Sequence, residues 1–339
     1  MLRSIRACPG PGRGEWMRKC VVIIPALNEE RTIGQVIDAV PQSLFGGEVT
    51  LEVVVVNDGS TDQTAELACE HGAFVINHES PQGVGASFSV GVKEALKRRA
   101  DYAVNIDADG QMNPEDVEKL LIPIMGGAAD MVTASRFKDK DLAPRMPKVK
   151  RWGNRKVAQI VSSIVGRKYY DVSCGFRAYN KETLLRLNLW GRFTYTQETF
   201  ISLAANHHLR IMEVPVKIRG EREYGKSRVA SSILKYAVRS GSIILSAYKD
   251  YQPVRFFGGL ALFFLLIGIA FETVFFGHYF MYGYFRDYLW AGLTGAFMAV
   301  VAMIFLIVMI ISDTLGKIMR TEEEILYFNK RAEDYREAE

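Results

Sequence analysis

The sequence predicts an α/β domain with a mostly parallel sheet and helices on both faces, followed by amphipathic interface helices and two transmembrane helices. The first observation is that short apolar runs, such as CVVIIPA and LEVVVVN, alternate with polar turns and helical segments. Runs that are apolar on both faces and separated by helices are typical of parallel sheets covered on each side. The second observation is a pair of apolar segments near the C-terminus, each long enough for the roughly 20 residues that a membrane crossing needs.

The composition narrows the classes of function. The chain has 339 residues, of which 42 are Lys or Arg and 38 are Asp or Glu, giving a net charge of +4. An excess this small does not indicate a nucleic-acid-binding protein, so we expect no nucleic-acid partner. The four cysteines form no C-x-x-C pair and indicate neither a zinc site nor a disulfide framework.

The elements of the soluble part follow in order. Residues 1–17 lack an apolar segment long enough for a signal peptide and are predicted to be a disordered leader. Residues 18–228 are predicted to form the α/β domain, in which Asn28 can cap the first helix and a second helix runs from about Asp62 to Gly72. The later elements are the strands FVINH, YAVNIDADG and DMVTASRF and the helix VGVKEALKRRA.

The C-terminal part is predicted to be bound to a membrane. Residues 229–252 have apolar residues at helical spacing and are expected to form amphipathic interface helices. Residues 253–314 would hold two transmembrane helices, and residues 315–339 a charged, solvated cytoplasmic tail. Glu272 interrupts the first span. An acid at this position is either a functional group or a helix-packing residue near the lipid boundary, and the interfacial or packing role is favoured.

The charges that flank the spans predict their orientation. Lys249 and Arg255 precede the first span and Lys317 and Arg320 follow the second, whereas the connection between the spans carries only Arg286. The positive-inside tendency therefore places the α/β domain and both chain ends in the cytoplasm of a multi-pass membrane protein, with the cell membrane of a prokaryote as the expected location. Glycines in the spans would permit close helix contacts and a homo-oligomer.

Three polar turns follow predicted strands: PALNEE, NDGS and DADGQ. Because ligands of parallel sheets bind at the carboxyl ends of the strands, these turns should share one edge. Asp107 and Asp109, with Gln111 as a neutral third ligand, can bind a hard divalent cation that shares its shell with substrate phosphates. An EF-hand is disfavoured because Met112 occupies the position of the turn glycine. A merely solvated turn is the other alternative.

Seven segments in order resemble one family. They are VVIIPALNEERTI, VVVVNDGSTDQT, NIDADGQMNP, ASRF, DVSCGFRAY, QETF and EVPVKIRGEREYGKSR. This series resembles family-2 glycosyltransferases of the GT-A fold, and most closely the dolichyl-phosphate mannose synthase group of polyprenyl-phosphate glycosyltransferases. The resemblance covers residues 20–228.

The resemblance implies a nucleotide-sugar site. Asp107, Asp109 and Gln111 would hold Mg²⁺ or Mn²⁺ against the diphosphate, with the backbone of Ala108 touching the nucleotide. The family's R-x-x-G-x-S-K pattern is met here by Arg222, Gly225 and Ser227, with Arg228 in place of the lysine. The residues implied for the base and ribose are Pro25, Leu27, Glu29 and Asp58.

The resemblance also implies an acceptor site for an anionic lipid. Arg136 and the basic stretch KVKRWGNRK are the candidate ligands of the acceptor phosphate, with Arg151, Asn154 and Arg155 as first choices within that stretch. Two alternatives stay open for the stretch. It can be a solvated basic loop, or its charges can attract anionic lipid.

The implied reaction is an inverting transfer of a hexose, which can be mannose, glucose or an N-acetylhexosamine. The donor would be a nucleotide-diphosphate sugar and the acceptor dolichyl or polyprenyl phosphate, in protein glycosylation or cell-envelope synthesis. A lipid phosphate is already ionised near neutral pH, so charge neutralisation and positioning matter more than a general base. A processive polysaccharide synthase and a non-catalytic nucleotide-sugar-binding scaffold are the alternative functions. The residues expected at the reacting centre are Asp109, Asp171, Gln197 and Glu198.

Overall fold

The computed structural model describes most of the chain. The described residues are 17–188, 196–206, 209–220, 241–242, 245–246, 248–249 and 251–336. Residues 1–16 of the predicted leader, most of the predicted interface helices, and Arg222 and Arg228 therefore lie outside the described residues.

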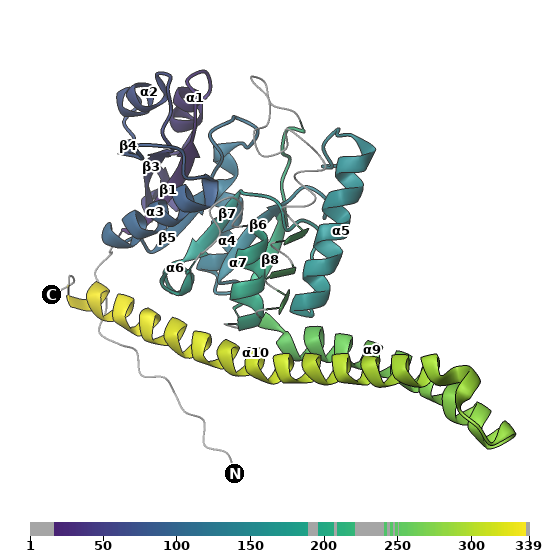
Figure 1. Ribbon diagram of the computed structural model, residues 1–339. Coiled ribbons are helices and arrows are strands. Elements are labelled where there is room, and N and C mark those ends of the chain that lie inside the picture. The colour runs from purple at the N-terminus through teal and green to yellow at the C-terminus, as the bar shows by residue number, and fades with distance from the viewer. Residues whose placement is uncertain are drawn as a thin grey trace, which may run out of the picture.

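The α/β domain is built on one mixed sheet with the strand order β2-β3-β1-β5-β7-β6-β8, and β4 pairs with β3 (Figure 1). Only β2 and β7 run antiparallel to their neighbours, so the prediction of a mostly parallel sheet is confirmed. The strands are β1 (Arg18–Ala26), β2 (Ser43–Leu44), β3 (Val49–Asn57), β4 (Phe74–Asn77), β5 (Tyr102–Asn105), β6 (Met131–Ser135), β7 (Arg177–Asn180) and β8 (Ile211–Pro215).

Helices cover both faces of this sheet. The α-helices of the domain are α1 (Ile33–Asp38), α2 (Thr64–Glu70), α3 (Val84–Lys97), α4 (Val117–Met125), α5 (Lys148–Val165), α6 (Lys181–Arg186) and α7 (Thr196–Ile201). Short 3₁₀ and π turns are η1 (Phe45–Gly47), η2 (Pro114–Asp116) and η3 (Ser202–Asn206). One expected cap is wrong, because α1 begins after Thr32, and the side chain of Asn28 instead accepts a hydrogen bond from Thr61 N.

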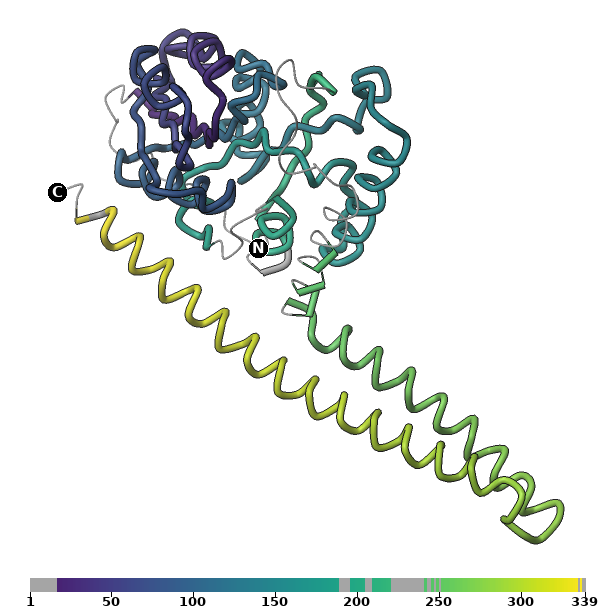
Figure 2. Tube along the Cα trace, turned by 45° about the horizontal axis from the view of Figure 1, so that its top comes forward, coloured from purple at the N-terminus to yellow at the C-terminus, as the bar shows by residue number. Residues whose placement is uncertain are grey.

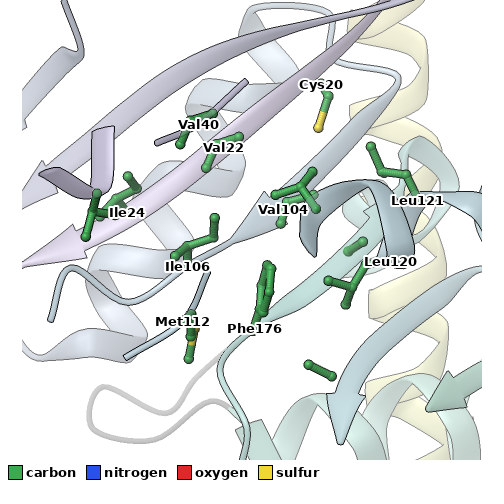
Figure 3. Packing of buried hydrophobic residues seen from close by; sticks show 14 of the residues in the cluster. Cys20, Val22, Ile24, Val40, Val104, Ile106, Met112, Leu120, Leu121 and Phe176 are labelled. Carbon is green, nitrogen blue, oxygen red and sulfur yellow. The ribbon is translucent and has the colours of Figure 1, made fainter. Parts of the chain in front are cut away.

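The strands are apolar throughout because alternate residues enter two separate cores. Val22 and Ile24 of β1 point to the face covered by α1 and α4, together with Phe176 (Figure 3). Val21 and Ile23 point to the opposite face, which α3, α5 and α7 cover. Burial on both faces is the reason that the sequence shows continuous apolar runs rather than alternation.

The topology gathers the candidate site at one edge. The parallel strands β1, β3, β5 and β6 end there, and the antiparallel β7 begins there. The turns that follow the parallel strands therefore meet the segment that precedes β7. This is the arrangement in which open α/β sheets bind ligands.

Two long helices follow the domain and lie side by side (Figures 1 and 2). They are α9 (Pro253–Tyr282) and α10 (Leu289–Arg336), joined through η4 (Arg286–Tyr288), and both are long and apolar enough to cross a membrane. A Cβ added to Gly295 of α10 would lie 2.7 Å from Oε1 of Glu272. Glu272 therefore packs directly against the partner helix, in line with the favoured packing role.

The distal part of α10 contacts the α/β domain. Residues 315–339 were predicted to be a charged, solvated tail, but the face of α10 that contacts α6 is not solvated. Tyr327, 3% exposed, donates a hydrogen bond of 2.9 Å to Glu182 Oε2, and Asp334 pairs with Lys181 at 2.7 Å. Lys330 donates to the carbonyl oxygens at the end of α6. We call these contacts between α6 and residues 327–334 the C-terminal clamp.

Candidate active site

The acidic turn after β5 is held against the start of β7. The side chain of Asn105 donates a hydrogen bond of 2.9 Å to the carbonyl oxygen of Gly175. A Cβ on Gly175 would lie 3.0 Å from Oδ1 of Asp107, so the glycine leaves room for this carboxylate. The half-buried Asp107 thus stands at the sheet edge in a space that a larger residue would fill.

The rest of the turn is folded onto itself and its neighbours. Asp109 is 5% exposed, and its Oδ1 accepts a hydrogen bond of 3.0 Å from Gln111 N. Gln111 Nε2 donates to the carbonyl oxygen of Arg219 at 3.0 Å. The hydroxyl of Thr32 donates to the carbonyl oxygen of Ala108 at 2.8 Å, which joins the turn to α1.

The donor set of this turn fits a hard divalent cation. Asp107, Asp109 and Gln111 offer carboxylate and amide oxygens, which are the ligands that Mg²⁺ prefers. In the described part of the chain, no group of three or more His, Cys, Asp or Glu side chains could hold a metal ion. A site with only two carboxylates suits an ion that completes its coordination with substrate phosphates and water.

Asp58, expected to contact the nucleotide, is engaged with the protein itself. Asp58 is 4% exposed, and its carboxylate accepts hydrogen bonds of 2.8 Å from the backbone N–H groups of Gln82 and Gly83. The ring of His78 lies 2.8 Å from Oδ1. These bonds fix the loop at the start of α3, so Asp58 shapes the edge of the expected nucleotide site.

The other residues expected at the base and ribose lie at the end of β1 and in the turn that follows it. Pro25, Leu27 and Glu29 are all half-buried there. The backbone N–H of Glu29 donates to the hydroxyl of Thr64 at 2.8 Å. The first turn is therefore docked on the segment after β3, and the two turns form one side of the edge.

A small pocket of about 70 Å³ opens beside the acidic turn. Its lining contains Asp107 and Gln111 together with three cations: Arg136 after β6, Lys150 on α5 and Arg219 after β8. The segment before β7 also contributes to the wall. The pocket thus combines oxygens of the kind that Mg²⁺ prefers with cationic groups of the kind that bind phosphates.

Arg136 is oriented by a buried carboxylate. Its Nε and Nη2 donate to Oδ2 and Oδ1 of Asp171 at 2.6 and 2.9 Å, and its backbone N–H donates to the same Oδ2 at 3.1 Å. Burial raises the pKa of Asp171, but the charge and hydrogen bonds of Arg136 outweigh it and hold the pKa below its usual value. Asp171, 1% exposed, therefore acts on the pocket through Arg136.

A second carboxylate binds the backbone at Asp171 and so helps to hold this ion pair in place. Glu213 of β8 accepts the backbone N–H groups of Tyr170 and Asp171. Burial raises the pKa of Glu213, and those two hydrogen bonds offset part of the effect. The neighbouring thiol of Cys174 has a pKa raised by burial to about 12, so it is protonated at neutral pH.

The buried Arg177 joins two segments that the sequence suggested separately. Its guanidinium donates to the carbonyl oxygens of Val172, Cys174 and Thr196, and lies 4.8 Å from the ring centroid of Phe200. The wall of the pocket is thereby tied to the start of α7. Arg177 lies in DVSCGFRAY, one of the seven segments that carry the family resemblance, but the sequence analysis assigned no role to this arginine.

Two further residues expected at the reacting centre lie on α7. Gln197 is 1% exposed, and its amide nitrogen is 3.5 Å from the hydroxyl of Ser173. Glu198 is half-buried on the same short helix. Through Ser173, Gln197 contacts the segment that lines the pocket.

Of Arg136 and the three first choices within the basic stretch, the structure brings only Arg136 into the lining of this pocket. Arg151 donates to the carbonyl oxygen of Pro144 at 3.1 Å and so supports the wall. Asn154 is buried, and Arg155 is exposed outside the lining. Lys150 belongs to the predicted stretch KVKRWGNRK but was not among its first choices, and it lines the pocket because the helical phase of α5 decides which of its cations faces there.

The chain is similar in sequence to known proteins. The family model described as glycosyl transferase family 2 matches residues 21–187. An uncharacterised protein of Methanocaldococcus jannaschii is 34% identical over 219 residues, which cover 64% of this chain and 88% of that protein. The UDP-N-acetylglucosamine–dolichyl-phosphate N-acetylglucosaminyltransferase of Methanococcus voltae is 31% identical, over 58% of this chain and 84% of that protein.

A solved structure shares the fold. It is glucosyl-3-phosphoglycerate synthase from Mycobacterium tuberculosis, in complex with Mn²⁺ and uridine-diphosphate-glucose. The match has a TM-score of 0.54 and 24% sequence identity, and covers 68% of this chain and 79% of that one. The predicted fold class is confirmed by this likeness together with the strand order of the sheet.

Proposed function

The chain belongs to glycosyltransferase family 2, and from this premise we propose that it transfers a hexose from a nucleotide-diphosphate sugar to polyprenyl or dolichyl phosphate. The observation that carries the proposal is the pocket whose lining contains both Asp107 and Gln111 and the cations Arg136 and Lys150. Two anions must meet in such a reaction, the donor diphosphate and the acceptor phosphate. The acidic turn would bind the donor diphosphate through a cation, and the side chains of Arg136 and Lys150 would bind the acceptor phosphate.

The chemistry needs positioning more than proton transfer. A phosphate oxygen of the acceptor attacks the anomeric carbon, while the bond from that carbon to the diphosphate breaks and its electrons leave with the nucleotide. Because the attacking oxygen is already ionised, Arg136 and Lys150 have to orient it without removing a proton. A single displacement of this kind inverts the anomeric carbon.

The metal proposal rests on the residues of the acidic turn. Asp107, Asp109 and Gln111 would hold Mg²⁺ or Mn²⁺, and the bound ion supplies neutralisation of the charge on the departing diphosphate. The structural relative with Mn²⁺ and a nucleotide sugar supports this assignment. Gln197 and Glu198 are the candidates for the sugar, while Asp171 serves by orienting Arg136.

The membrane part supplies access to the acceptor. A long isoprenoid chain stays in the bilayer with its phosphate at the surface, and α9 and α10 would hold the domain there. The cations that flank the spans favour a cytoplasmic domain and cytoplasmic chain ends. The dolichyl-phosphate named for the Methanococcus relative supports a lipid acceptor. A processive polysaccharide synthase is disfavoured because the sequence contains no Q-x-x-R-W segment.

The test is a transfer assay with the full chain in lipid vesicles. A panel of GDP-mannose, UDP-glucose and UDP-N-acetylhexosamines is offered with a polyprenyl phosphate, and the glycolipid is identified by mass. We expect one donor to give product, Asp109→Ala to abolish it, and Glu118→Ala, which changes an exposed acid on α4, to keep it. No product with any donor, or unchanged transfer by Asp109→Ala, would contradict the proposal.

A further inference from the structure

Helix α5 has an apolar face that no other described element covers. Val149, Trp152 and Ile160 are 60%, 63% and 48% exposed, and with Lys156 they recur at spacings of three and four residues. The opposite face of the helix carries the buried residues Asn154, Ala158, Val161 and Ile164. Residues three and four apart share one side of a helix, so the exposed residues form a continuous stripe. We call Val149, Trp152, Lys156 and Ile160 the α5 stripe.

The surroundings of the α5 stripe are strongly cationic. Residues 148–170 contain seven Lys and Arg residues and no Asp or Glu. Lys156 Nζ lies 5.9 Å from the ring of Trp152, and Lys168 Nζ lies 5.1 Å from the ring of Tyr170, which is 41% exposed. A helix with exposed aromatic and aliphatic residues on one side and cations around them is typical of binding to an anionic bilayer surface.

The position of α5 agrees with a bilayer as its partner. The side-chain amide of Gln252 donates to the carbonyl oxygen of Ile164, which joins the end of α5 to the residue before the first span. In both views α5 lies on the side of the domain toward which α9 and α10 project, and its axis runs across theirs (Figures 1 and 2). A helix in this orientation lies along the membrane surface when α9 and α10 cross the membrane.

We propose that the α5 stripe rests on the anionic surface of the bilayer while Lys150, on another side of the same helix, faces the pocket. This inference deepens the proposed function and rests on it for its consequence. A phosphate anchored in the bilayer would meet Lys150 and Arg136 at the level of the lipid headgroups. The acceptor would then not have to leave the membrane to reach the acidic turn.

Docking is tested without activity by the fluorescence of Trp152. The full chain and Trp152→Phe are placed in vesicles of phosphatidylcholine with phosphatidylglycerol, with and without brominated acyl chains. The difference between the two proteins reports Trp152, and we expect bromine to quench it and aqueous iodide to leave it. Absence of quenching by bromine would overturn the proposal: quenching by iodide alone would mean that the stripe faces water, and quenching by neither would mean that protein, such as a second copy of the chain, covers it.

The consequence for transfer is tested with a matched pair of variants. Ile160→Glu puts a charge in the α5 stripe, and Ile122→Glu puts the same charge at a 54% exposed position on α4. We expect Ile160→Glu to raise the KM for polyprenyl phosphate about fivefold or more and to leave nucleotide-sugar binding unchanged, because it weakens contact with anionic lipid. Equal KM values for the two variants would contradict the role of docking in acceptor use. If the chain showed no transfer at all, the proposed function would fail while the fluorescence result still decided the docking.

Discussion

The guanidinium of Arg136 and the carboxylate of Asp171 form a bidentate ion pair next to the pocket, with hydrogen bonds of 2.6 and 2.9 Å. The two residues are 35 positions apart in the chain and come from the end of β6 and the segment before β7. Asp171 is fully buried, whereas Arg136 also reaches the pocket lining. The pair therefore links the stability of the domain to the geometry of the site.

Removing the arginine should destabilise the domain strongly. Arg136→Ala leaves the carboxylate of Asp171 buried without its charge partner, which costs about 3–5 kcal/mol in comparable buried pairs. Arg136→Lys keeps the charge and loses the fork, so it should retain more stability than activity. Thermal melting of the detergent-solubilised chain measures the first effect, with the exposed Arg155→Ala as control. Equal melting temperatures for Arg136→Ala and Arg155→Ala would show that the pair contributes nothing.

Acid should remove the contribution of this pair. The pKa of Asp171 is lowered in the folded state, so its contribution is complete above the unfolded value near 3.9 and is lost as pH falls through the folded value. The difference in melting temperature between the wild type and Arg136→Ala should therefore shrink as pH falls below about 4. Glu213 has the opposite sign because its pKa is raised: its contribution is present at low pH and declines as pH rises. A difference that stays constant down to low pH would contradict the ionised state assigned to Asp171.

Lys150 should matter more for the acceptor than its neighbour Arg155. Lys150 lines the pocket and Arg155 does not, although both are exposed cations of α5. A charge-assisted hydrogen bond to phosphate is worth enough that Lys150→Ala should raise the KM for polyprenyl phosphate about tenfold. Arg155→Ala should change it less, and neither variant should alter nucleotide-sugar binding. Steady-state kinetics over a range of acceptor concentrations measures both KM values. A larger increase in Arg155→Ala than in Lys150→Ala would contradict this prediction and favour Arg155, the residue chosen from the sequence.

The C-terminal clamp should hold the end of α10 on the α/β domain. Tyr327→Ala removes the hydrogen bond to Glu182 and the ring that lies 4.0 Å from the guanidinium of Arg186. Truncation of a buried aromatic side chain costs about 3 kcal/mol, so hydrogen exchange of residues 322–336 should become faster. Phe328→Ala, at a position that is 60% exposed, should leave the exchange rates unchanged. The same protection in both variants would mean that the clamp does not hold the helix.

The parallel sheet and the acidic turn could be predicted because their signals are local. Continuous apolar runs such as that of β1 arise from burial on both faces, and the turn after β5 carries its carboxylates next to the strand. Parallel pairing then brings the turns to one edge without further information. The apolar length of the two spans is likewise visible in the sequence.

The partners of single side chains could not be predicted in this way. Asp171 was expected at the reacting centre, but no local pattern indicated that Arg136 would pair with its carboxylate. The choice between Lys150 and Arg155 depends on where α5 turns relative to the sheet, which no local pattern records. The distal part of α10 looked solvated because it is charged, yet Tyr327 and Lys330 use their polar groups on α6.

The proposed reaction depends on a cation held by Asp107, Asp109 and Gln111, which would neutralise the charge of the departing nucleotide diphosphate. The most direct measurement is the rate of sugar transfer by the vesicle-bound chain after complete chelation of divalent ions and after return of Mn²⁺ or Mg²⁺. We predict that chelation lowers the rate by about a hundredfold or more and that the added ion restores it in the wild type but not in Asp109→Ala. Transfer that continues at the same rate after complete chelation would contradict the account.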